Sequence, residues 1–96
     1  MYDFTMQDAE LTAATEGREV WRLHPNHGLA FLVAYYAPGD GYIWGEVFPD
    51  KDGDGWVWSV WNGSNCVRGM RGKRPEESAE IAVKRAEDLV TKTLSA

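Results

Sequence analysis

The twenty residues from Tyr42 to Trp61 constrain the fold of this chain more than any other stretch. They read YIWGEVFPDKDGDGWVWSVW and contain four of the five tryptophans, in two aromatic and β-branched runs on either side of an acidic segment with two glycines. Such runs around a turn of Asp and Gly are the sequence signal of a β-hairpin. The pattern therefore predicts two antiparallel neighbouring strands, at about residues 42–48 and 56–62.

Two further apolar segments precede this hairpin. Residues 19–24, EVWRLH, alternate as a half-buried strand does, and residues 29–37, LAFLVAYYA, are apolar on both faces. The turn-forming segments PNHG and APGDG lie at residues 25–28 and 37–41. Because strands joined by short connections usually pair as neighbours, we predict a four-stranded antiparallel sheet in sequential order.

The C-terminal part of the chain predicts a helix over about residues 75–94. Pro75 suits the first helical position, and Glu76 and Glu77 suit the positive end of the helix dipole. Small and apolar residues recur three and four positions apart and form one narrow stripe that can pack on a sheet: Ala79, Ala82, Val83, Ala86, Leu89 and Val90. The segment before the helix, residues 62–74, is rich in Gly, Asn, Ser and basic residues and predicts a loop.

Residues 1–17 predict a short N-terminal element. Helix-forming residues followed by Gly17 favour a helix, and a strand is the alternative. Taken together, the pattern predicts an α+β fold in which one antiparallel sheet carries the C-terminal helix on one face. A length of 96 residues predicts a single domain, 1–96.

Composition narrows the class of protein. The single cysteine, Cys66, excludes an intramolecular disulfide framework and favours a reducing compartment. The first ten residues lack the basic and apolar regions of a signal peptide, and no apolar run reaches the roughly 18 residues of a membrane helix. We therefore expect a soluble cytoplasmic protein without membrane contacts. Its net charge of −5 argues against binding nucleic acid over the whole surface.

The tryptophans exceed what one helix can cover. Side chains alternate along a strand, so Trp56 and Trp58 face one side of the sheet and Trp61 faces the other. Tryptophans that the helix leaves uncovered must be covered by the N-terminal segment, by a second copy of the chain, or by a partner. Four tryptophans are thus the predicted partner-binding residues: Trp44, Trp56, Trp58 and Trp61.

The acidic turn has two interpretations. Asp50, Asp52 and Asp54 with Gly55 match the opening of an EF-hand calcium loop, but Trp61 stands where the bidentate glutamate belongs and the flanking residues predict strands. A hairpin turn, which the same residue types favour, is the first interpretation, with the three aspartates available to a protein partner. Calcium binding by these aspartates is the alternative.

A basic cluster follows the hairpin. Arg68, Arg71, Lys73 and Arg74 are spaced by glycines just before the predicted helix. A solvated loop, a contact with an acidic protein, and a platform for single-stranded nucleic acid together with exposed tryptophans are the three interpretations. Glu76 and Glu77 lie directly beside the cluster and oppose an anion there.

The sequence offers little for catalysis. A nucleophile elbow, a phosphate-cradling glycine motif and an HExxH motif are all missing. His24, His27 and Cys66 are the residues from which a Cys/His pair could be built, and isolated residues of these types are usually structural. We therefore predict a protein that is not an enzyme and needs no cofactor or metal.

Three features of residues 29–94 resemble small accessory proteins encoded by bacteriophages and prophages, among them the anti-CRISPR proteins. They are the strand Trp56-Val57-Trp58 after an Asp/Gly turn, the glycine-containing loop at residues 69–72, and the alanine-rich C-terminal helix. The resemblance implies a non-catalytic protein-binding module that inhibits a host defence complex. The layout is also similar to the double-stranded RNA-binding domain, but Pro75-Glu76-Glu77 replaces the lysine-rich helix start of that domain.

Overall fold

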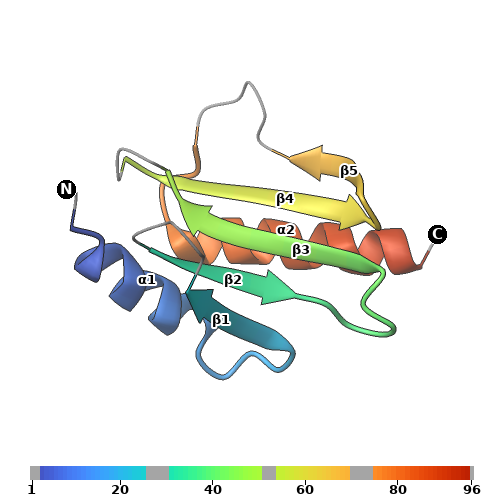
Figure 1. The fold of residues 1–96 in the computed structure, drawn as a ribbon, viewed down its shortest axis with the longest axis horizontal. Coiled ribbons are helices and arrows are strands. Elements are labelled where there is room, and N and C mark those ends of the chain that lie inside the picture. The colour runs from blue at the N-terminus through green and yellow to red at the C-terminus, as the bar shows by residue number, and fades with distance from the viewer. Residues whose placement is uncertain (1–2, 26–30, 51–53, 70–74, 96) are drawn as a thin grey trace.

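Two helices and five strands make up the chain. A computed structural model describes residues 3–25, 31–50, 54–69 and 75–95. The elements follow in the order α1 (Thr5–Thr15), β1 (Trp21–Pro25), β2 (Leu32–Tyr36), β3 (Ile43–Pro49), β4 (Trp56–Asn62), β5 (Asn65–Gly69) and α2 (Ala79–Leu94). The strands form one antiparallel sheet in the order β1-β2-β3-β4-β5, with α2 running behind it in the view of Figure 1. The predicted α+β class, the sheet and the C-terminal helix are confirmed.

The sheet has five strands, so the prediction of four was wrong. Residues 65–69 lie in the segment that was predicted as a loop, and they pair with β4 as an edge strand. The turn between the two strands contains Gly63, whose φ of 60° is the conformation that a tight hairpin turn requires. The two turn residues between the paired Asn62 and Asn65 are Gly63-Ser64, and this dipeptide is the sequence signal for the hairpin. The sequence of β5 does not alternate between apolar and polar residues, because residues 65–67 are exposed at the sheet edge. The strand therefore lacks the pattern by which the others were predicted.

Helix α2 begins four residues later than predicted. The side chain of Ser78 caps it by accepting a hydrogen bond from the backbone N–H of Ile81 (3.2 Å), and the carboxylate of Glu10 in α1 accepts from the N–H of Ala79 (2.8 Å). Glu76 instead pairs with Trp56 at the start of β4 through two backbone hydrogen bonds of 2.9 Å. Pro75 and Glu76 therefore belong to a strand-like contact that ties the approach to α2 onto the sheet.

The N-terminal element is a helix, as the first of the two alternatives predicted. Helix α1 is followed by Gly17 with a φ of 76°, the left-handed conformation that commonly ends a helix. Leu11 of α1 is fully buried and joins the same core as α2. The core therefore receives side chains from both ends of the described chain.

The core lies between α2 and one face of the sheet. The buried positions of α2 follow the predicted stripe: Ala79, Ala82, Val83, Ala86 and Val90. They meet Trp21, Ala34, Val47 and Trp56 from the sheet. A Cβ atom placed on Gly45 of β3 would lie 3.2 Å from a methyl carbon of Val90. Small side chains on both elements thus allow α2 to lie close to the central strand.

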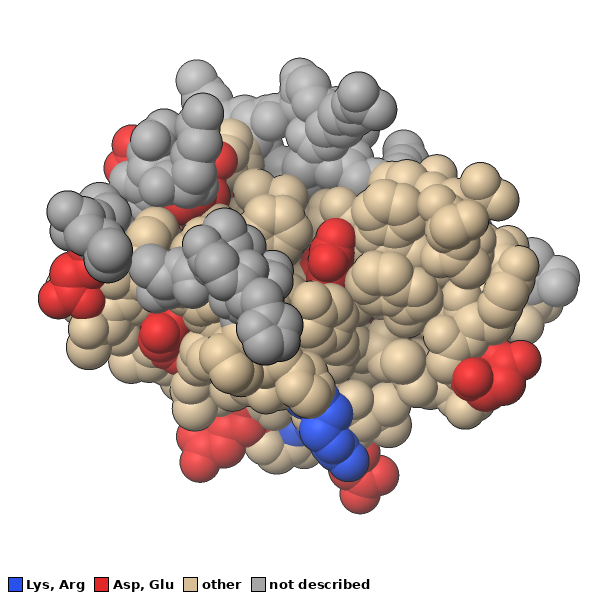
Figure 2. Space-filling view, in the orientation of Figure 1, with Lys and Arg blue, Asp and Glu red and all other residues tan. Residues whose placement is uncertain are grey.

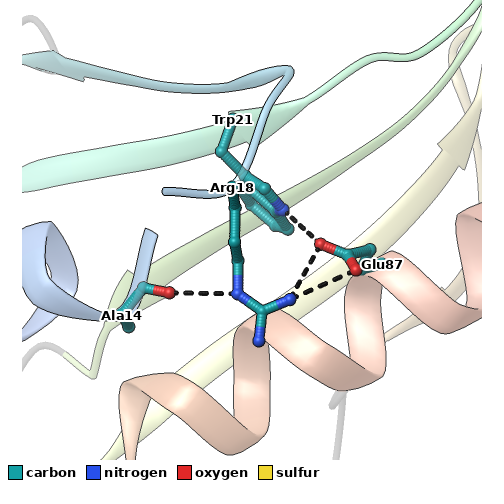
Figure 3. Close-up of polar contacts among 4 residues, drawn as sticks. All are labelled: Ala14, Arg18, Trp21 and Glu87. Carbon is teal, nitrogen blue, oxygen red and sulfur yellow. Dashed lines mark hydrogen bonds and ion pairs between the residues drawn. The ribbon is translucent and has the colours of Figure 1, made fainter. Parts of the chain in front are cut away.

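Glu87 of α2 joins three elements in one polar cluster (Figure 3). Its carboxylate accepts a hydrogen bond of 2.8 Å from the indole N–H of Trp21 in β1, and pairs with the guanidinium of Arg18 at 3.2 Å. The same guanidinium donates to the carbonyl of Ala14 in α1. The cluster therefore connects α1, β1 and α2 around Trp21, whose side chain is buried.

Replacing Glu87 with alanine is expected to lower the free energy of unfolding by about 2 kcal/mol, because the indole N–H of Trp21 then lacks its acceptor. Glu87→Gln is the matched control, since an amide oxygen can still accept from Trp21 while the ion pair with Arg18 is lost. The ion-pair side chains are 32% and 28% exposed, so the control should lose less than about 1 kcal/mol. Urea denaturation of both variants measures the difference, and equal losses would contradict the role assigned to Trp21.

Candidate functional site

The tryptophans of the hairpin divide between the two faces of the sheet. Trp56 and Trp58 pair with Pro49 and Val47 and lie on the side of α2, where Trp56 is 3% exposed. Trp44 and Trp61 are cross-strand partners on the opposite side and are only half-buried. Trp56 is therefore a core residue and not a contact residue. The open face, the side of the sheet away from α2, keeps Trp44 and Trp61.

An aromatic row crosses the open face from β1 to β4. It consists of His24, Tyr35, Trp44 and Trp61. The ring centroids of Trp44 and Trp61 are 5.7 Å apart with planes 12° from parallel, while Tyr35 is tilted by 53° against Trp44 at 5.9 Å. Aromatic pairs at such distances and angles attract one another beyond the effect of their buried area. The row therefore presents large rings, packed on one another, at the surface.

A carboxylate lies within this aromatic row. Glu46 of β3 is the cross-strand partner of Tyr35 on one side and of Ser59 on the other. Its Oε1 atom accepts a hydrogen bond of 3.1 Å from the indole N–H of Trp61. In the described part of the chain there are two ion pairs, and neither includes Glu46. The half-buried charge is thus held by one indole and by no cation of the described chain.

Burial raises the pKa of Glu46 above its ordinary value of 4.5, and the hydrogen bond from Trp61 opposes that change in part. Burial also raises the pKa of the Tyr35 hydroxyl, with the charge of Glu46 adding to it. Figure 2 shows the same face in space-filling form: uncharged side chains gather over β3 and β4, with an acidic side chain visible between them. The open face therefore combines apolar area with a negative charge.

An open hollow continues the face at the β1 edge. It is lined by Glu19, Val20, Arg22, His24, Tyr35 and Ala37, so it shares two rings with the aromatic row. Val20 has a φ of 78°, a left-handed conformation that is costly for a β-branched residue. Near the start of β2 and the end of β3, Phe31 stacks with Phe48 and contacts the buried Phe4. The accessible part of the open face thus runs from this hollow to Trp61.

The acidic turn is only partly described. Asp50 closes the turn by donating its backbone N–H to the carbonyl of Gly55 at 2.8 Å, and the side chain of Asp54 is exposed. Asp52 lies outside the described residues. Within the ranges that the structure describes, no three His, Cys, Asp or Glu side chains gather as a metal site would need. The turn joins two strands, which is the hairpin interpretation of this segment.

The structure describes one residue of the basic cluster and two of the three residues of the possible Cys/His pair. Arg71, Lys73 and Arg74 lie outside the described residues, and the backbone of Arg68 in β5 pairs with Val60 of β4. His24 and the exposed Cys66 stand on β1 and β5, the two opposite edges of the sheet. They are four strand spacings apart, too far for a nucleophile and its base. His27 also lies outside the described residues.

Two residues of the open face were missed as candidates. The sequence signal for Glu46 is its position between Trp44 and Phe48 on one face of an otherwise apolar strand. Tyr35 belongs to a segment predicted to be buried on both faces, yet its ring is half-exposed. Only the pairing of β2 with β3 brings Tyr35 beside Glu46.

Comparisons with protein-family models, curated proteins and solved structures find no match to this chain. Among the helices of the described residues, none has the length and apolar character needed to cross a bilayer. The open face is the feature of the described chain that bears on function.

The charge of Glu46 should make folding stability depend on pH. Because the pKa of Glu46 is higher in the folded than in the unfolded chain, the folded state holds this proton more tightly. Its contribution to stability is then fully present below about pH 4.5 and is lost as pH rises through the folded pKa. Glu46→Gln should remove this loss, so the variant gains stability over wild type at neutral pH but not below pH 4.5.

Thermal denaturation from acid to neutral pH measures this gain. Glu77→Gln, at an exposed position, is the matched control for the loss of one negative charge. A Glu46→Gln variant that tracks the control at every pH would contradict the assigned burial of the Glu46 charge.

Proposed function

We propose that this chain is a non-catalytic protein-binding module whose open face contacts the partner. The observation that carries the proposal is the stacked pair of Trp44 and Trp61 on the side of the sheet away from α2. Rigid aromatic side chains lose little conformational entropy on binding, and tryptophan and tyrosine are enriched among residues that dominate interface energies. Together with Tyr35 they form an anchor set for a protein surface.

A protein partner fits this face better than nucleic acid does. Single-stranded nucleic acid also stacks on aromatic rings, but it needs cations along its phosphates. Here the charge between the rings is the carboxylate of Glu46, and the chain carries a net charge of −5. Electrostatic repulsion therefore disfavours a phosphate backbone across the open face. A host defence complex as the partner, and inhibition as the outcome, stay predictions from the resemblance to phage accessory proteins.

The proposal is tested by affinity capture with tagged protein as bait in host lysate, with and without nuclease, followed by mass spectrometry. We expect a protein partner that survives nuclease, and a Kd for the purified partner that rises at least about tenfold in the double variant Trp44→Ala/Trp61→Ala. Ile81→Ala is the matched control, because Ile81 is an exposed apolar residue on α2. It should bind as wild type does.

Two results would contradict the proposal. Partners that disappear with nuclease would favour the nucleic-acid alternative, with the basic cluster as its site. A partner that binds the double tryptophan variant normally but loses affinity for Ile81→Ala would place the interface on the helical side. Circular dichroism of each variant establishes that it is folded before affinity is compared.

A further inference from the structure

The carboxylate of Glu46 is a charge without a counter-charge from the described chain. Its Oε1 atom accepts from Trp61, and within the described ranges no donor contacts Oε2. A carboxylate can accept several hydrogen bonds, and a half-buried one gains most from a donor that also carries positive charge. The open face therefore has a vacant acceptor at the centre of its aromatic row.

The nearest cation in the same cross-strand row does not use this acceptor. Arg22 pairs with Tyr35, and Tyr35 pairs with Glu46, so the three residues lie on successive strands. The guanidinium of Arg22 donates to the carbonyl of Trp21 at 3.0 Å. Among the residues that the structure describes, no cation therefore reaches this acceptor.

The rings around Glu46 select the kind of cation. Trp44 and Tyr35 are tilted by 53° to one another, so they present aromatic surface in two directions beside the carboxylate. Ring faces attract cations, and the planar guanidinium of arginine can stack on a ring while it donates two parallel hydrogen bonds to a carboxylate. The compact ammonium of lysine cannot do both.

We propose that Glu46, Tyr35 and Trp44 receive an arginine side chain from a basic segment of the partner protein. The guanidinium donates to the free carboxylate oxygen of Glu46 and lies against the aromatic rings. This inference rests on the proposed function, because it names the chemistry of the partner at the same face. A second copy of this chain is a poor occupant, since a symmetric contact brings two Glu46 carboxylates together.

The test uses the full chain and a short peptide of alternating arginine and glycine, with matched peptides of citrulline and of lysine. Citrulline has the shape of arginine but no charge. We expect the arginine peptide to shift the indole N–H resonance of Trp61 and to bind at least about tenfold more tightly than the citrulline peptide. Glu46→Gln should remove this preference, whereas Glu77→Gln, which loses the same charge elsewhere, should keep it.

Three results with the peptides would overturn the proposed contact at Glu46. They are equal binding of arginine and citrulline peptides, equal binding of the arginine peptide to wild type and Glu46→Gln, and no resonance shift with any peptide. Equal binding of lysine and arginine peptides would overturn the choice of arginine. A different result would contradict the proposed function, namely a captured partner that binds Trp44→Ala/Trp61→Ala with unchanged affinity. A partner whose affinity falls in that double variant but not in Glu46→Gln would support the open face as the interface and contradict the arginine contact.

Discussion

Replacing Trp56 with alanine is expected to lower the free energy of unfolding by about 3–5 kcal/mol, the usual cost of deleting a buried indole. The side chain is 3% exposed and packs in the core that α2 covers. A domain of this size has a total stability of about 5–15 kcal/mol, so the variant should be close to unfolding. Urea denaturation, monitored by circular dichroism, measures the loss.

Trp44→Ala is the matched control, because it removes the same side chain from the neighbouring strand on the open face. Trp44 is only half-buried, so the expected loss is smaller, below about 2 kcal/mol. A loss at Trp44 as large as that at Trp56 would mean that the open face serves mainly to stabilise the fold. That result would argue against the proposed function as well.

Replacing Gly55 with alanine is expected to cost about 3 kcal/mol, through backbone strain and crowding together. Gly55 has a φ of 133°, which residues with a side chain rarely adopt. An added Cβ would lie 2.8 Å from the Cβ of Pro75 and 2.9 Å from the carbonyl oxygen of Glu76. Both neighbours belong to the segment that pairs with Trp56, so neither can move without breaking that contact.

Gly39→Ala separates the two causes of this loss. Gly39 also has a positive φ, of 73°, but a Cβ added there meets no atom within 4 Å. The control should therefore show strain alone, about 1 kcal/mol. Equal losses at the two glycines, measured by the same denaturation experiment, would contradict the tight contact between the β3–β4 turn and residues 75–76.

The parts of the fold that the sequence predicted are those that depend on local periodicity. Alternation placed Trp56 and Trp58 on one face and Trp61 on the other, and the stripe from Ala79 to Val90 marked the buried side of α2. Both signals arise from neighbouring residues on one element. They need no knowledge of what the element packs against.

The parts that were missed depend on contacts between segments far apart in the chain. Helix α2 starts late because Glu76 pairs with Trp56, and nothing near Pro75 shows that pairing. The candidate site follows the same rule. Glu46 was visible as a charge on an apolar face, but its position beside Tyr35 is set by the register between β2 and β3. The alternation of apolar and polar residues within β2 or within β3 does not determine the register between these two strands.

The order of elements along the chain has a consequence for how the molecule folds. All five strands pair with their sequence neighbours, so each strand pair closes only a short loop when it forms. The core cannot form from such local contacts, because it needs contacts between the two ends of the chain. Arg18 contacts Glu87, and Glu10 contacts Ala79, and each pair is separated by 69 positions in the sequence. During synthesis α2 is also the last of these elements to emerge. We therefore expect the strand pairs to form before the core does, and the docking of α2 to complete the core.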